Sequence, residues 1–244
     1  MALLFRAARV AAAVGTTAVA GWEFRRRQLI AQRDQTREDF RGSSSFYGKM
    51  WGWEVDYQLM ITFWDGDLVL AQHHLPGLPV HEAMLVALRR AWYKSSWDMV
   101  GVVHRPGGRV DVAMLGRAPG QEGVHALGYA DLLAAASTGV VAVRRVKMED
   151  EDRKQMREWL RKEIQNPTVR GPTLIEEVQG ALGAAPQGVL SPSQWVLHSL
   201  HAGIGGEPPV VDGIQDLTGE LHSSLELGDA RLPALEVTYL RADE

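Results

Sequence analysis

The chain has no cysteine among its 244 residues. This absence excludes a disulfide framework, a thiolate metal site and a cysteine nucleophile, whereas metal sites built from histidine and carboxylates stay open. The chain also has no surplus of basic residues, because its formal net charge is −4. A dedicated nucleic-acid-binding protein usually carries a basic face, so we expect no nucleic-acid partner.

A long hydrophobic run is missing near the N-terminus. The uncharged stretch from Val10 to Trp22 has 13 residues, which is short of the roughly 18–20 that cross a bilayer core. Counting from Leu3 gives about the required length, with the arginines of the first ten residues reaching toward one interface. Trp22 and the arginines at 25–27 would then lie at the other interface.

The same segment is strongly basic. Residues 1–33 contain six arginines and one acid, Glu23. An arginine-rich, acid-poor and alanine-rich start is typical of a mitochondrial transit peptide. A retained membrane anchor and a soluble surface helix are the two other interpretations. We expect residues 1–27 to form a retained, ordered helix that anchors the protein and also serves as an import signal.

The remaining chain divides into a connector and one domain. Residues 28–56 are polar and include a stretch rich in glycine and serine, which predicts a connector. Residues 57–244 form the predicted domain. Its strands are expected at 67–71, 100–104, 109–113, 139–146 and 235–240, and its helices at 81–92, 149–164, 172–183 and 192–203. This order predicts an α+β domain with an antiparallel sheet and packed helices.

Three segments carry a family resemblance. They are DGDLVL at 65–70, SSWDMVGVV at 95–103 and GVVAVRRV at 139–146. Together they resemble the permuted papain-like cysteine amidases of the YiiX-like branch, over about residues 60–240. The resemblance implies a permuted papain-like fold. It also implies a catalytic histidine in a Trp-x-His-Val-Gly strand, a polar partner on the next strand, and a cysteine at the start of a late helix.

The three catalytic positions of that family are degenerate here. Met99 occupies the histidine position, Met114 or a close neighbour the orienting position, and Pro192 the cysteine position. Asp111 is three residues from Met114 and therefore faces the opposite side of its strand. Methionine and proline cannot transfer a proton or attack a carbonyl group. The resemblance therefore implies no catalytic residue and no enzyme activity, and it predicts that Met99, Met114 and Pro192 lie close together.

The sequence also contains candidate residues for a serine hydrolase site and for a metal site. A serine hydrolase would use Ser191 or Ser193 with His198 or His104, but Ser191 is more simply a helix N-cap. A metal site would draw on a group of histidines and one acid, namely His73, His74, His81 and Glu82, or on His198 with His201. Zinc needs three or four convergent ligands. We therefore expect exposed loop histidines, no metal and no cofactor.

Seven of the eight tryptophans fall into two groups, and Trp22 lies in the N-terminal segment described above. Four lie on apolar faces and are expected in the core: Trp92, Trp97, Trp159 and Trp195. An earlier cluster of Trp51, Trp53 and Trp64 fits a protein interface, because aromatic residues concentrate at buried contacts.

These observations predict a non-catalytic accessory subunit of a membrane-bound complex. Its partners would be the neighbouring subunits, with the membrane reached through the N-terminal helix. The basic N-terminus favours the mitochondrial inner membrane, with a respiratory complex or the ATP synthase as examples, and another organellar membrane as the alternative. The alternative function is a module that binds an acyl chain or small ligand in a relic cleft lined by Met99 and Met114, since methionine suits adaptable apolar pockets.

Overall fold

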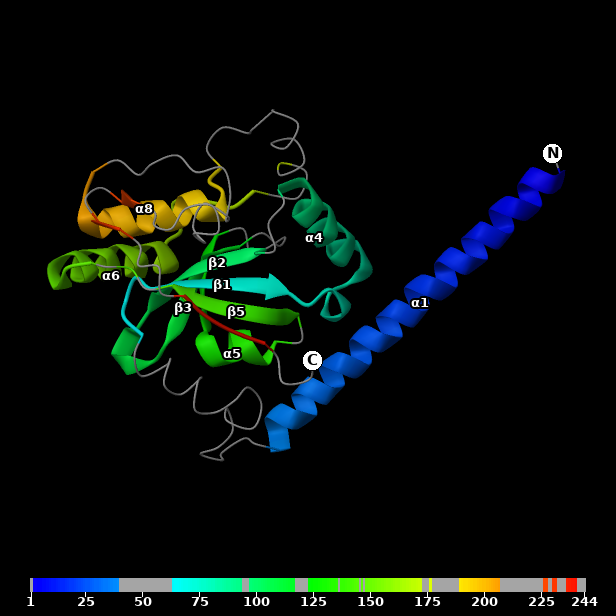
Figure 1. Ribbon diagram of the computed structural model, residues 1–244, viewed down its shortest axis with the longest axis horizontal. Helices are drawn as coiled ribbons and strands as arrows, with labels where there is room; N and C mark the ends of the chain where they lie inside the picture. Colours follow the sequence, from blue (N-terminus) through cyan, green and yellow to red (C-terminus); the bar gives the residue numbers. More distant parts are fainter. Residues whose placement is uncertain are drawn as a thin grey trace.

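An antiparallel sheet forms the centre of the fold (Figure 1). The computed structural model describes residues 2–39, 63–93, 97–116, 123–135, 137–144, 146, 148–172, 176, 189–206, 226–227, 230–231 and 236–240. Within this part of the chain, helices pack against both faces of the sheet. The predicted α+β class with an antiparallel sheet is confirmed.

The sheet has six strands in the order β4-β3-β2-β1-β5-β8, and every neighbouring pair is antiparallel. The strands are β1 Leu68–His73, β2 Met99–His104, β3 Asp111–Leu115, β4 Val124–Gly128, β5 Thr138–Arg144 and β8 Glu236–Leu240. A separate pair consists of β6 Glu226–Leu227 and β7 Ala230–Arg231. Five sheet strands match the predicted positions. The sequence reasoning missed β4, which is short and whose three middle residues are only partly buried or exposed.

The described helices are α1 Ala2–Asp39, α4 Val80–Tyr93, α5 Tyr129–Ala134, α6 Asp150–Gln165 and α8 Pro192–Ile204. Two 3₁₀ turns, η1 Leu75–Gly77 and η2 Pro106–Gly108, complete the set. The predicted helices at 81–92, 149–164 and 192–203 are confirmed. The helix predicted at 172–183 lies mostly outside the described residues. The short helix α5 was not predicted.

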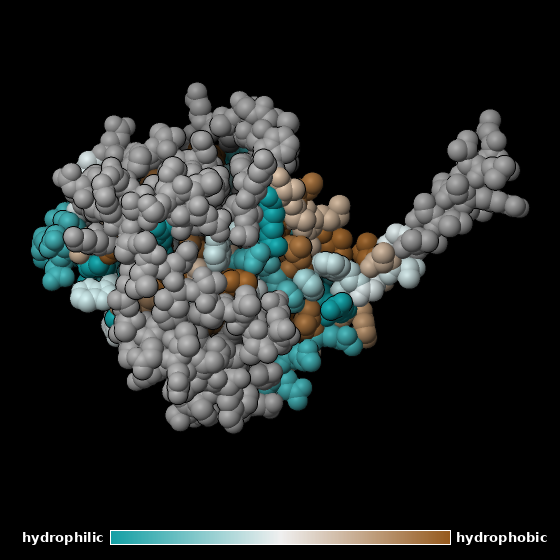
Figure 2. Space-filling model, in the orientation of Figure 1, coloured by the Kyte–Doolittle hydropathy of each residue, from teal (hydrophilic) through white to brown (hydrophobic). Residues whose placement is uncertain are grey.

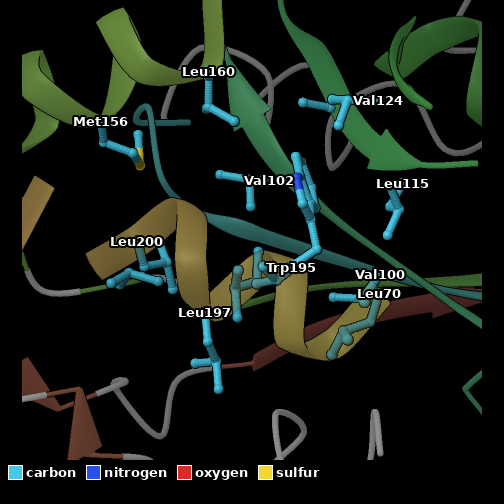
Figure 3. Packing of buried hydrophobic residues seen from close by; sticks show 14 of the residues in the cluster. Leu70, Val100, Val102, Leu115, Val124, Met156, Leu160, Trp195, Leu197 and Leu200 are labelled. Atoms are coloured by element: carbon cyan, nitrogen blue, oxygen red, sulfur yellow. The ribbon is translucent and has the colours of Figure 1, made fainter. Parts of the chain in front are cut away.

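Helices α6 and α8 cover one face of the sheet, here called the α8 face (Figure 1). Its core contains side chains that alternate along the strands, and the helices add Met156, Leu160, Trp195 and Leu200 (Figure 3). The rings of Trp159 and Trp195 lie 6.3 Å apart. A Cβ atom at Gly203 would collide with the carbonyl oxygen of Asp152, so this glycine allows α6 and α8 to approach closely. The predicted core positions of Trp159 and Trp195 are confirmed, and Trp97 also packs against this core.

The opposite face, here called the α5 face, carries a second core. Its members include Val69, Val103 and Val112 from the strands and Leu132 and Leu133 from α5. The rings of Phe63 and Tyr129 meet edge to face, with centroids 4.8 Å apart. The sheet is therefore buried on both faces, which explains the nearly continuous apolar runs of β1 and β2.

Helix α1 is longer than expected and projects from the domain (Figure 1). It continues past residue 27 to Asp39, into the segment that was predicted as a connector. Trp22 joins it to the domain: its indole nitrogen donates to the carbonyl oxygen of Leu78 at 2.9 Å, and its ring packs on a small cluster around Ala83 and Val86. No helix in the described part of the chain is long and apolar enough to span a membrane.

Candidate functional site

Met99 and Met114 lie on the α5 face. Met99 is the first residue of β2 and packs against the second core, to which Met114 belongs. Met114 faces Gly101 across the β2–β3 pair, and a Cβ atom at Gly101 would lie 2.6 Å from its Cγ. The structure therefore places these two predicted positions on one side of the sheet.

Pro192 lies on the other side. It opens α8, whose residues Trp195 and Val196 pack on the α8 face together with Val100. Successive residues of a strand point to opposite faces, so Val100 faces α8 and Met99 faces away from it. The placement of Met99 and Met114 on the face away from α8 counts against their predicted convergence with Pro192, which stays a prediction.

The serine and histidine candidates do not form a nucleophile–base pair. The hydroxyl oxygen of Ser191 accepts a hydrogen bond from the backbone nitrogen of Gln194 at 3.1 Å, which confirms its predicted N-cap role. The Nδ1 atom of His201 lies 3.0 Å from the carbonyl oxygen of Gly205. In the parts of the chain that the structure describes, neither His104 nor His198 hydrogen-bonds to Ser191 or Ser193.

The histidines considered for a metal site are distributed over three elements. His81 is exposed on α4, with its Nε2 atom 3.8 Å from Glu82. His73 is the last residue of β1 and is partly buried, so the expectation of an exposed loop is wrong for it. Over the described ranges, no three histidine or carboxylate side chains come together as they would around a metal ion.

His73 lies beside a buried ion pair at the end of β1. The carboxylate of Asp98 accepts from the backbone nitrogen of His73 at 2.7 Å and from Nε and Nη2 of Arg90 at 3.1 and 2.5 Å. Arg90 also donates to the carbonyl oxygen of His73 at 2.6 Å. Burial lowers the pKa of His73 from 6.5 to about 4, although Asp98 opposes this shift.

We expect the low pKa of His73 to make stability depend on pH. The unfolded chain binds a proton at this histidine below about pH 6.5, whereas the folded chain binds it only near pH 4. The contribution of neutral His73 to folding stability is therefore complete above pH 6.5 and is lost as the pH falls toward 4. Because of this group, the free energy of unfolding measured in urea should be about 1–2 kcal/mol lower at pH 5 than at pH 7. His73→Gln should reduce the difference, and His81→Gln, at an exposed side chain, is the control. An unchanged difference in His73→Gln would contradict the assignment.

A pocket of about 530 Å³ lies between α6 and the α8 face of the sheet. Its sheet wall includes His104 and Asp111, which are opposite each other in the β2–β3 pair. Its helix wall includes Arg157 and Arg161, which are one turn apart on α6. The other lining residues are Arg105, Pro106, Gly107, Ala126, Ile164 and Gln165.

Asp65 contacts three residues of the pocket lining. Its Oδ1 atom accepts from the backbone nitrogen of Arg105 at 2.7 Å, and its Oδ2 atom lies 3.1 Å from Nη2 of Arg157. The Nδ1 atom of His104 is 3.8 Å from Oδ1 of Asp65. Burial lowers the pKa of His104, and the nearby carboxylates of Asp65 and Asp111 partly oppose this. The imidazole is therefore neutral at neutral pH.

Arg153 joins the backbone at Asp65 to the segment before α6. Its guanidinium group donates to the carbonyl oxygens of Asp65, Met148 and Val146, and it lies 5.1 Å from the ring centroid of Trp64. Trp64 is half exposed, whereas Trp51 and Trp53 of the same predicted interface cluster lie outside the described residues.

The pocket was missed in the sequence reasoning because its residues are far apart in the chain. His104 was considered only as a base for a serine. The joint position of the lining residues depends on how α6 crosses the sheet. The comparisons add no further assignment: no protein-family model, curated protein or solved structure matches this chain.

Proposed function

We propose that the protein is a non-catalytic accessory subunit that docks onto a larger assembly through helix α1. One observation carries the proposal: α1 has 38 residues, which corresponds to a length of about 57 Å, and it extends well beyond the domain (Figure 1). The main described contacts between α1 and the domain are with η1 and α4, around Trp22.

Exposed apolar side chains surround this junction. Val19 and Phe24 of α1 are 51% and 64% exposed, and Met84 and Leu88 of α4 are 61% and 64% exposed. Figure 2 shows hydrophobic surface over α4 and the adjoining part of the molecule. Exposed large apolar side chains on both helices of this junction favour a contact with another protein. A projecting helix also gains stability mainly from packing, so a partner would stabilise α1.

The finer parts of the proposal come from the sequence. The six arginines and one acid of residues 1–33 favour the mitochondrial inner membrane, with a respiratory complex or the ATP synthase as examples of the assembly. A permuted papain-like origin of the domain is supported by three sequence segments, and the positions of Met99 and Pro192 on opposite faces count against it.

The proposal predicts that substitutions on α1 separate the protein from its partners. The tagged full chain, purified natively in mild detergent, should co-migrate with other proteins. The double variant Val19→Ser/Phe24→Ser should lose most of these partners, because it removes exposed apolar surface without touching the core. The matched control is Ala18→Ser/Ala20→Ser, at exposed positions of the same helix.

Co-migrating proteins would be identified by mass spectrometry, and the fold of each variant would be checked by circular dichroism. A wild-type protein that purifies as a lone, monodisperse monomer would overturn the proposal. Equal loss of partners in the two double variants would show that α1 docks through something other than these apolar side chains.

A further inference from the structure

The pocket between α6 and the sheet carries excess positive charge. Its lining contains three arginines and one carboxylate. Asp65 is the ion-pair partner of Arg157, and Asp111 accepts from Nε of Arg109 at 2.6 Å. The guanidinium groups of Arg105 and Arg161 therefore have no carboxylate partner in the described part of the chain.

Two polar side chains of the pocket lining are only partly hydrogen-bonded by the described residues. The Nδ1 atom of His104 and the Nε atom of Arg105 are buried and have no hydrogen-bond partner among the described residues. His104 is only 6% exposed. Buried polar groups are nearly always hydrogen-bonded, so these two lining side chains keep hydrogen-bonding capacity that the described residues do not use.

We propose that this pocket binds the phosphate monoester of a small molecule, with Arg105 and Arg161 as the phosphate-binding residues. This inference goes beyond the proposed function and does not depend on it. A phosphate monoester carries a charge of about −1.5 to −2 at neutral pH, which matches two uncompensated guanidinium groups. Arginine also binds phosphate through two parallel hydrogen bonds, which a single ammonium group cannot provide.

The remainder of the pocket accommodates an organic group. A volume of about 530 Å³ exceeds the needs of a bare phosphate ion and lies within the usual range for small-molecule sites. Pro106, Ala126 and Ile164 provide apolar surface beside the arginines. Asp111 adds a hydrogen-bond acceptor for a hydroxyl group on the ligand.

Isothermal titration calorimetry on the full chain tests the proposal. Inorganic phosphate and glucose 6-phosphate are the probes, glucose is the uncharged control, and the ionic strength is held constant. We expect saturable binding of both phosphate probes and none of glucose. Arg161→Gln should weaken binding by about tenfold or more, because a charge-assisted hydrogen bond is lost. The affinity of Arg161→Lys for phosphate should lie between those of the wild type and Arg161→Gln, since lysine keeps the charge but not the planar donor geometry.

Lys162→Gln is the matched control. It lies next to Arg161 on α6, is also exposed, and removes the same charge, but it does not line the pocket. Its affinity for phosphate should stay within about twofold of the wild type, because an exposed charge outside the site is screened. Equal weakening in Arg161→Gln and Lys162→Gln would overturn the proposal, as would the absence of wild-type binding at tens of millimolar phosphate. Since Arg161 is exposed, its variants should fold, and Arg105→Gln provides a second test of the site.

Discussion

Replacing Trp195 with alanine should lower the free energy of unfolding by about 3–5 kcal/mol. The side chain is completely buried on α8, at the centre of the core between the helices and the sheet (Figure 3). Val100, Val102 and Leu115 lie around it, and Trp159 borders it. A cavity of this size between a rigid sheet and a helix pair would close only in part, which places the loss in the range for large-to-small substitutions.

Packing accounts for this effect, because the indole nitrogen of Trp195 has no hydrogen-bond partner within the described residues. Equilibrium unfolding in urea would measure the loss. Trp195→Phe should lose less stability, because it keeps a large aromatic side chain in the core. It can be measured even if the alanine variant does not fold. Leu88→Ala, at a side chain that is 64% exposed, should change stability by less than about 0.5 kcal/mol. A loss from Trp195→Ala as small as that of Leu88→Ala would contradict the assigned core.

Removing the carboxylate of Asp98 should also be strongly destabilising, by about 3–5 kcal/mol. Asp98 is 5% exposed and receives one backbone and two guanidinium hydrogen bonds. In Asp98→Ala the backbone nitrogen of His73 loses its acceptor, and Arg90 becomes a partly buried charge without its counter-ion. These contacts join the end of β1, the start of β2 and helix α4, so their loss weakens three elements at once.

A double-mutant cycle would separate the ion pair from the other contacts of Asp98. The losses from Asp98→Ala and Arg90→Leu should not add, because the double variant leaves no unpaired charge. Glu82→Ala is the control for a simple change in charge, since its side chain is half exposed on the same helix as Arg90. Additive losses in thermal or urea unfolding would contradict the coupling between Asp98 and Arg90.

The role of Asp98 also bears on the amidase resemblance. Trp97, Asp98, Val100 and Gly101 keep the pattern of the family's strand motif. In the structure, Asp98 is explained by its ion pair and Val100 by the α8-face core. Gly101 is explained by the closeness of Val112 and Met114, because a Cβ atom there would lie 2.5 Å from Cγ1 of Val112. Each of these residues therefore has a structural reason that does not involve catalysis.

Local signals in the sequence were sufficient for most of the secondary structure. The apolar stripe of Met156, Leu160 and Ile164 predicted α6, and Ser191 followed by Pro192 predicted the start of α8. The Pro106–Gly108 turn between two apolar runs predicted the β2–β3 pair. These predictions hold because caps, turns and periodicity act over a few residues and need no distant partner.

The sequence by itself determined the α+β class, the absence of cysteine chemistry and most helix and strand positions. Only the tertiary structure decided that Met99 faces α5 while α8 packs on the other face, and that His104 meets Arg157 and Arg161 in one pocket. The reason is physical: alternation along a strand separates its two faces but does not say which helix covers which face. That choice depends on loop paths and on packing between elements far apart in the chain.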